Sequence, residues 1–66
     1  MTATPDGSAL GEVYFEFTVV GRTVKVAAIH AATGVEVSVV GPVGAARADL
    51  QQLALQKLKA RLKAGG

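Results

Sequence analysis

The chain has 66 residues, a formal net charge of +2 and no cysteine, and 50% of its residues are hydrophobic. This length allows one domain at most and no disulfide is possible, so the small core would gain stability from self-association. No apolar run approaches the roughly 18 residues of a membrane-spanning helix, and residues 1–10 lack the pattern of a secretory signal. We therefore expect a folded cytoplasmic protein that does not enter a membrane.

Residues 1–10 contain threonine, proline, glycine and serine without apolar periodicity, which predicts a flexible N-terminal tail. The following residues, 11–64, are expected to form the single domain. Its first stretch, residues 11–20, alternates strictly between apolar and polar side chains, as in a strand with one buried face. The positions predicted to face the core are Val13, Phe15, Phe17 and Val19.

A two-residue turn at Gly21 and Arg22 separates this strand from a second one, Thr23 to His30. Glycine at the first central position suits a type II′ hairpin. This loop length pairs Val19 with Val24, so that inward residues oppose inward residues. Register and burial therefore agree at the first hairpin.

A third strand is predicted over about residues 35–40, with its valines facing inward, after a turn in which Gly34 takes a positive φ. Pairing of His30 with Val35 keeps the inward faces together. Pairing of Ala32 with Val35 does so equally well, and the register of the second hairpin stays open.

The run from Gly41 to Gly44 breaks the alternation, and an amphipathic helix follows to about Lys63. Its start is predicted near Ala45, because the alanines there are good helix formers. A capping box formed by Asp49 and Gln52 gives a later start as the alternative. The predicted apolar stripe of the helix consists of Leu50, Leu53, Ala54, Leu58 and Leu62.

The order of elements, β-β-β-α with short connections, predicts an α+β fold. Three strands form an antiparallel meander, and the C-terminal amphipathic helix packs on one face of it. A single helix covers only one face of such a sheet, so the other face is left open. Any function is expected on that open face.

Five short runs follow a family pattern, namely Gly11–Phe17, Val24–Ile29, Thr33–Ser38, Gly41–Pro42 and Leu53–Leu58. Together they resemble a family of small uncharacterised bacterial proteins, most of them alphaproteobacterial. The resemblance implies the same fold and a bacterial cytosolic origin, and it implies no activity, cofactor or ligand. His30 stands where this family more often has aspartate, which speaks against an essential imidazole.

Catalytic, metal and cofactor sites are not expected. His30 is the single histidine, and only Glu12 and Glu36 could join it, whereas a zinc site needs several convergent ligands. Glu12 and Glu16 share one strand face, where solvated or ion-paired carboxylates are the ordinary state. The sequence therefore predicts a non-enzymatic protein.

Apolar residues outside the predicted core favour a protein-binding role. On the open face the hairpin registers place Tyr14 beside Ile29, with Ala27 nearby. On the helix, Leu55 lies about 140° from Leu50 and therefore outside the apolar stripe. We expect Tyr14, Ala27, Ile29 and Leu55 to contact a protein partner or, in a homodimer, a second copy of the chain.

Nucleic-acid binding, with RNA as the ligand, is the alternative. A phosphate-binding surface would use the basic residues of the first hairpin and of the helix, which are Arg22, Lys25, Lys57, Lys59, Arg61 and Lys63. The four helical cations spread around much of the helix and form no single stripe, so this interpretation ranks second.

Overall fold

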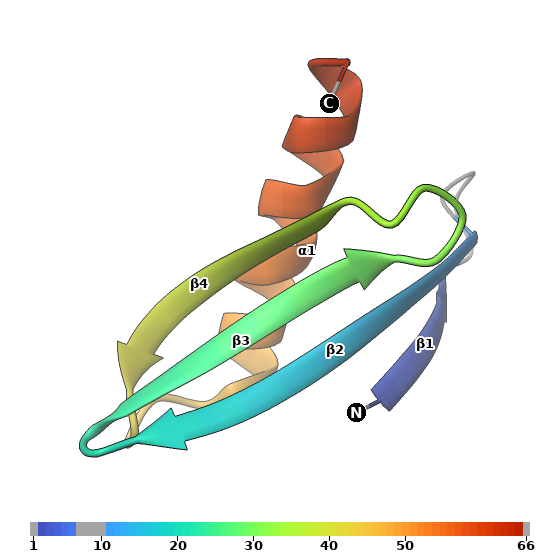
Figure 1. Ribbon diagram of the computed structural model, residues 1–66. Helices are drawn as coiled ribbons and strands as arrows, with labels where there is room; N and C mark the ends of the chain where they lie inside the picture. Colours follow the sequence, from blue (N-terminus) through green and yellow to red (C-terminus); the bar gives the residue numbers. More distant parts are fainter. Residues whose placement is uncertain (1, 7–10, 66) are drawn as a thin grey trace.

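The computed structural model describes residues 2–6 and 11–65 of the chain. Its elements are β1 (Thr2–Asp6), β2 (Gly11–Val20), β3 (Thr23–His30), β4 (Glu36–Pro42) and α1 (Arg47–Lys63). The strands form one antiparallel sheet in the order β1-β2-β3-β4, and α1 crosses one face of it (Figure 1). The predicted β-β-β-α meander is confirmed in β2, β3, β4 and α1.

Strand β1 differs from the tail predicted for residues 1–10. Thr2–Asp6 pair with β2, with Thr2 opposite Phe15 and Asp6 opposite Gly11. Residues 1 and 7–10 of that predicted tail lie outside the described residues. The sequence signal fails here because β1 has no alternating apolar pattern and contains a proline, both of which argue against a central strand.

Hydrogen-bond parity explains why Pro5 is tolerated in β1. The Ala31 N–H donates to the Glu12 carbonyl oxygen at 3.1 Å, so the peptide groups of Glu12 face β3. Pro5 lies opposite Glu12, at a position where an N–H would point away from β2. Proline there removes no hydrogen bond of the ladder and belongs on the outer edge.

The first hairpin has the predicted register, with Val19 opposite Val24 and Phe17 opposite Val26. Gly21 has a φ of 59°, and Arg22 does not have a positive φ, which is the pattern of a type II′ turn. The structure thus confirms both the turn type predicted from Gly21 and the register predicted from the alternating pattern.

The second hairpin takes the first of the two registers left open by the sequence. The His30 N–H donates to the Val35 carbonyl oxygen at 2.8 Å, and Ile29 lies opposite Glu36. Gly34 has the predicted positive φ, at 75°. Strand β4 is displaced slightly from the predicted range, since it begins at Glu36 and ends at Pro42.

Helix α1 begins at Arg47, close to the favoured start near Ala45. Ala46 is the N-cap, and its carbonyl oxygen accepts from the N–H groups of Asp49 and Leu50 at 3.1 and 3.2 Å. Asp49 therefore lies in the first turn, and no side chain caps the helix. The later start at an Asp49 capping box is not observed.

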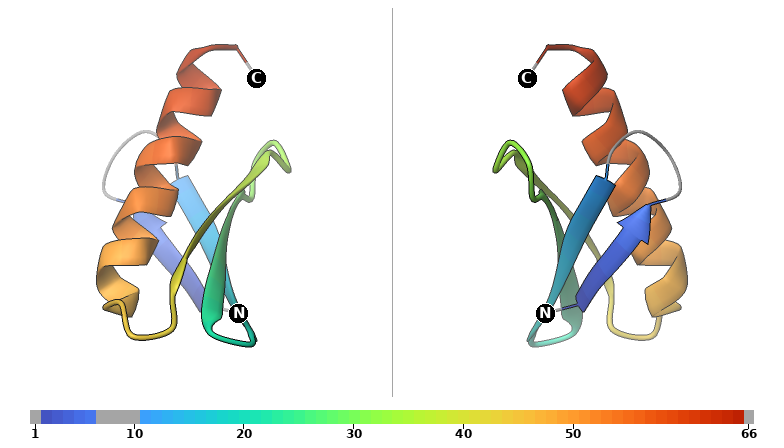
Figure 2. Two further views of the ribbon diagram at one scale, coloured as in Figure 1. Left: turned by 90° about the vertical axis from the view of Figure 1, so that its left-hand side faces the viewer. Right: turned by 90° about the vertical axis from the view of Figure 1, so that its right-hand side faces the viewer.

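The core lies between α1 and the sheet, where α1 packs on β3 and β4. Edge-on views show α1 against one side of the sheet and no helix against the other (Figure 2). Gly41 admits the helix closely, because a Cβ at this position would lie 2.6 Å from Leu50 Cδ2. The buried core residues are Val13, Phe15, Val24, Val26, Ala28, Val37, Leu50, Ala54 and Leu58.

The helix buries a different flank from the one predicted. Leu53 is 53% exposed, whereas Leu55 is half-buried and packs against the core. The two residues lie about 100° to either side of Ala54, the middle of the buried row that Leu50 begins and Leu58 ends. Leu62 lies about 80° from Ala54 on the side of Leu55, so the spacing itself favours this flank, and α1 buries it against the sheet.

Candidate functional site

The sheet face turned away from α1 is built from the alternate positions of β2, β3 and β4. The register places Tyr14, Ile29 and Glu36 in one row, and Glu16, Ala27 and Ser38 in the next. We call this surface the open face. Its members are Glu12, Tyr14, Glu16, Thr18, Val20, Thr23, Lys25, Ala27, Ile29, Glu36, Ser38 and Val40.

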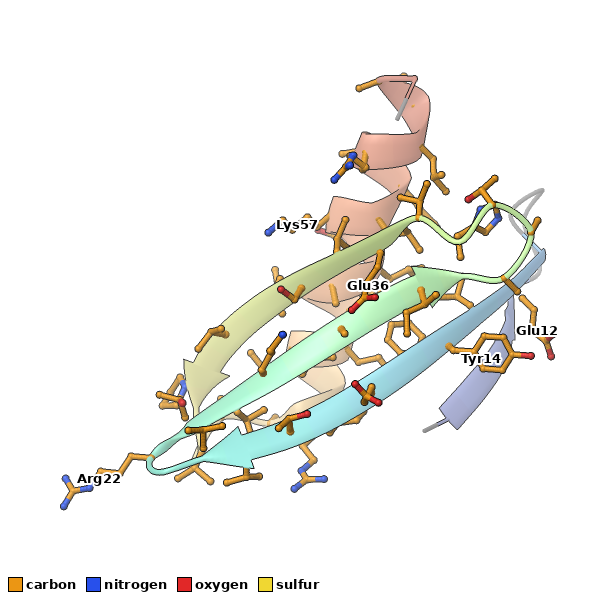
Figure 3. All side chains as sticks on the ribbon, in the orientation of Figure 1. Glu12, Tyr14, Arg22, Glu36 and Lys57 are labelled. Atoms are coloured by element: carbon orange, nitrogen blue, oxygen red, sulfur yellow. The ribbon has the colours of Figure 1, made fainter. Side chains whose placement is uncertain are left out.

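Tyr14 and Ile29 form the apolar centre of the open face. Both side chains are half-buried and lie opposite each other on neighbouring strands, as predicted. The Tyr14 hydroxyl donates to Glu12 Oε1 at 3.0 Å, and the two side chains lie together at one end of β2 (Figure 3). This hydrogen bond and the negative charge of Glu12 raise the pKa of Tyr14 above its ordinary value.

Ala27 also lies on the open face but has almost no surface of its own. It is 2% exposed, although α1, the helix that the structure describes, lies on the other face of the sheet. Its cross-strand neighbours Glu16 and Ser38 carry longer side chains, and Lys25 and Ile29 flank it along β3. A partner on this face would meet those neighbours before it reached the Ala27 methyl group.

Leu55 belongs to the opposite side of the sheet. It packs against the core beneath α1 and therefore does not join Tyr14 and Ile29 on one surface. Of the four residues expected to contact a partner, the structure brings two together, buries Ala27 beside them and separates Leu55 from them. Leu55 was expected outside the apolar stripe because the predicted stripe ran through Leu53 on the other flank of the helix.

The charges of the open face are mostly negative. Glu12, Glu16 and Glu36 are exposed there, and Lys25 is the one basic residue among the members of the open face. This polarity was present in the sequence, since all three carboxylates occupy outward positions of the alternating pattern. The face combines a small apolar centre with an acidic surround.

The basic residues of the alternative interpretation do not gather on one surface. Arg22 lies at the tip of the β2–β3 turn, at the end of the sheet away from Lys57 (Figure 3). Lys57 Nζ donates to the Ser38 carbonyl oxygen at 2.7 Å and so joins α1 to the outer edge of β4. Lys59, Arg61 and Lys63 are exposed on the last turns of α1.

Arg47 has a structural role that sequence analysis missed. Its guanidinium carbon lies 5.4 Å from the centroid of the Phe17 ring, a cation–π distance. Arg47 is the first residue of α1, where the helix dipole disfavours a cation. The contact with Phe17 offsets that effect and closes one end of the core. No sequence signal links these two distant residues.

His30 sits in the second hairpin and is 8% exposed. Its Nδ1 lies 2.8 Å from Thr33 Oγ1, a hydrogen bond within the turn. Within residues 2–6 and 11–65, no cluster of three or more potential metal ligands is present. His30 thus serves the turn in this structure.

Comparison with known protein families identifies a family for this chain. A family model for a domain of unknown function (DUF6898) matches residues 10–65. The chain belongs to this family. Membership covers β2, β3, β4 and α1, so the expected resemblance to a family without an assigned function is confirmed.

No curated protein and no solved structure matches the chain. In the described part, α1 is too short and too polar to be a membrane-spanning helix. The function therefore has to be argued from the surface itself.

Proposed function

We propose that this protein is a non-enzymatic interaction module of the bacterial cytoplasm that binds a basic polypeptide segment through its open face. The observation that carries the proposal is the Tyr14–Ile29 pair, which none of the described helices and strands covers and which exposed glutamates surround. The bacterial and cytoplasmic parts of the proposal follow from the family resemblance stated above, and the lack of cysteine in the sequence is compatible with them.

The composition of the face supports a protein ligand. Protein interfaces combine an apolar or aromatic centre with a polar rim, and tyrosine is frequent among the residues that dominate binding energy. Here Tyr14 and Ile29 supply the centre, and Glu12, Glu16 and Glu36 supply the rim. A lysine- or arginine-rich segment with one or two aliphatic side chains complements both features.

Face-to-face pairing of two copies is a poorer fit. It would bring two sets of Glu12, Glu16 and Glu36 against each other, and like charges across an interface cost binding energy. The proposal therefore assigns the open face to a basic partner, not to a second copy.

The same geometry supports the non-enzymatic part of the proposal. The His30 imidazole forms a hydrogen bond with Thr33 in the turn, and the carboxylates of the open face, two on β2 and one on β4, are exposed. General acid–base or nucleophilic catalysis needs such groups to converge on a shared substrate position.

The test uses the full chain as bait, compared with Tyr14→Ala/Ile29→Ser. Leu53→Ser is the matched control, because Leu53 is 53% exposed on the helix. A captured protein is identified, purified and titrated into each variant labelled with ¹⁵N. We expect the double variant to weaken binding more than about fivefold, corresponding to about 1 kcal/mol, and the control to bind normally.

Two further outcomes decide the proposal. Shift changes centred on residues 12–16, 27–29 and 36, weakened by salt, would support it. Equal binding by the double variant and by wild type, or shift changes confined to α1, would contradict it.

Binding of RNA is the second candidate, favoured by one observation. Lys59, Arg61 and Lys63 are each exposed on the last turns of α1. Titration of a short double-stranded RNA at low salt would give binding that falls steeply with added salt and is lost in Lys59→Glu/Arg61→Glu/Lys63→Glu. Absence of any shift at low salt would eliminate this candidate.

A further inference from the structure

In the described part of the chain, β4 forms one outer edge of the sheet. The His30 N–H donates to the Val35 carbonyl oxygen at 2.8 Å, so the peptide groups of the odd-numbered residues along β4 face β3. The peptide groups of Glu36, Ser38 and Val40 therefore point away from the sheet. No described strand lies along that side of β4.

A lysine of α1 occupies the middle of this edge. Lys57 Nζ donates to the outward carbonyl oxygen of Ser38 at 2.7 Å (Figure 3). Lysine at a sheet edge opposes pairing with another chain, because a neutral or basic strand gives the ammonium group no counter-charge. A strand with carboxylate side chains supplies that counter-charge.

The last turns of α1 extend past this edge of the sheet (Figures 1 and 2). At 100° per residue, Arg61 lies about 20° from Ala54 and so continues the row formed by Leu50, Ala54 and Leu58. Those three side chains are buried against the sheet, whereas Arg61 is exposed. The described sheet ends before this turn of the helix, which explains the exposure of Arg61.

Lys57 and Arg61 lie four residues apart on the same side of α1. Arg61 is about 6 Å farther along the helix axis than Lys57. This distance is comparable with the spacing of about 4.8 Å between neighbouring strands. Lys57 reaches the edge of β4, and α1 crosses β4 (Figure 1). Arg61 therefore lies over the place that a strand next to β4 would occupy.

We infer that an acidic, extended segment of another protein pairs antiparallel with β4 over residues 36–40, beneath the last turns of α1. Its carboxylates face α1 and form ion pairs with Lys57 and Arg61. Addition of a peptide strand to a sheet edge is a common mode of peptide recognition. The Glu36 carboxylate does not oppose this contact, because it belongs to the open face. The inference goes beyond the proposed function, since it uses a basic edge and leaves the open face to its own ligand.

A second copy of the chain fits this edge poorly. Antiparallel pairing of two copies about Ser38 would place both Lys57 ammonium groups beside the two-fold axis. Like charges across an interface cost binding energy. The charges at the edge therefore favour an acidic partner over a homodimer.

The geometry also determines which backbone groups of the added strand are used. Its residues opposite Val37 and Val39 direct their side chains toward α1 and their N–H groups away from β4. The residues between them direct their N–H groups toward β4. Acidic side chains and the hydrogen bonds to β4 thus belong to alternate residues of the partner.

The probe for this contact is a short capped peptide in which glutamate alternates with valine or threonine. It is titrated into the full chain labelled with ¹⁵N. We expect a dissociation constant below about 1 mM and shift changes at residues 36–40, Lys57 and Arg61. A peptide with lysine in place of every glutamate should bind at least about tenfold more weakly.

Charge reversal on α1 tests the predicted side of the helix. Lys57→Glu/Arg61→Glu should weaken binding of the glutamate peptide at least about tenfold. Lys59→Glu/Lys63→Glu is the matched control, because it changes the net charge equally but lies about 140° and 180° from Ala54. Circular dichroism confirms that both variants are folded. Equal losses in the two variants would overturn the inference.

Methylation of the peptide backbone tests strand pairing without altering the protein. N-methyl groups on the glutamates should leave binding nearly unchanged, whereas N-methyl groups on the alternate residues should abolish it. Equal binding of the two methylated peptides, or no shift changes with millimolar glutamate peptide, would overturn the inference. Shift changes at residues 36–40 that depend only on the concentration of the protein would assign the edge to a second copy and would also overturn it. Tyr14 and Ile29 take no part in this contact, so the inference can fail while the proposed function stands.

Discussion

The two faces of the sheet obey different constraints, although one alternating sequence produces both. In β3, Val26 and Ala28 point toward α1 and are 0% exposed. On either side of them along β3, Lys25 and Ile29 point to the open face and keep contact with solvent. On the covered face, α1 limits the volume of each side chain. On the open face, the charge and shape of the surface determine which ligands can bind.

Ala27 and Ala28 show the difference most directly. They are adjacent and are 2% and 0% exposed. Ala28 is buried by the helix layer, whereas Ala27 is buried by longer side chains beside it. The two alanines therefore have low exposure for different reasons. Only the helix layer above Ala28 limits the size of the side chain at its position.

The largest expected effect is a loss of stability, and it distinguishes a buried leucine of α1 from an exposed one. Leu58 is 0% exposed and Leu53 is 53% exposed on the same helix. Leu58→Ala should lower the free energy of unfolding by about 2–5 kcal/mol, because it leaves a cavity in the core. Leu53→Ala should change it by less than about 0.5 kcal/mol. Urea denaturation measures both, and equal effects would contradict the observed flank.

Enlarging the two neighbouring alanines tests the faces themselves. Ala28→Val should cost about 1–3 kcal/mol, because an added side-chain volume meets the helix layer. Ala27→Val should stay within about 0.5 kcal/mol of wild type, because no described element lies above it. If both variants were destabilised equally in urea denaturation, the open face would be covered in solution.

Gly41 tests how closely α1 approaches β4. A Cβ at this position would lie 2.6 Å from Leu50 Cδ2, so Gly41→Ala forces Leu50 to shift. We expect a loss of about 1 kcal/mol, at the lower end of overpacking costs because the end of a leucine side chain can adjust. Gly44→Ala is the control, since a Cβ at position 44 would meet no described atom within 4 Å. Thermal unfolding that ranks the two variants equally would contradict the close approach.

The smallest effect concerns the titration of the open face. Tyr14 is the only tyrosine, so its absorbance can be followed alone. Its hydrogen bond to Glu12 raises the pKa above the ordinary value of 10.0, so the neutral phenol is favoured in the folded state. Any stability from this bond is complete below pH 10 and is lost as the pH rises through the raised pKa.

A pair of alanine substitutions isolates the cause. Glu12→Ala should lower the pKa of Tyr14 toward its ordinary value, because it removes both the hydrogen-bond acceptor and the negative charge. Glu16→Ala, on the same strand face, should leave the titration nearly unchanged. An unaltered pKa in Glu12→Ala would show that the side chains do not interact in solution.

The strands β2 and β3 were predictable because alternation and turn chemistry agree. Gly21 fixes the loop, and the loop fixes which residues oppose one another. At the second hairpin, Gly34 indicated the turn, but two registers kept the same faces inward. The hydrogen bond between His30 and Val35 distinguishes them, and no local pattern encodes it.

The candidate site was predictable only in part. Tyr14 and Ile29 follow from parity, because outward residues on paired strands must be neighbours. Leu55 was misplaced because its angle was taken from Leu50 alone, although Leu62 lies on the same flank as Leu55 and also packs against the core. The burial of Ala27 depends on the lengths of neighbouring side chains on other strands.

The sequence by itself determined the fold class, the first hairpin and the acidic character of the open face, since local periodicity controls each of them. Only the tertiary structure decided that Leu53 stays exposed, that Arg47 packs on Phe17, and that β1 joins the edge of β2. These features depend on contacts between segments distant in the chain. Local propensity and periodicity contain no information about such contacts.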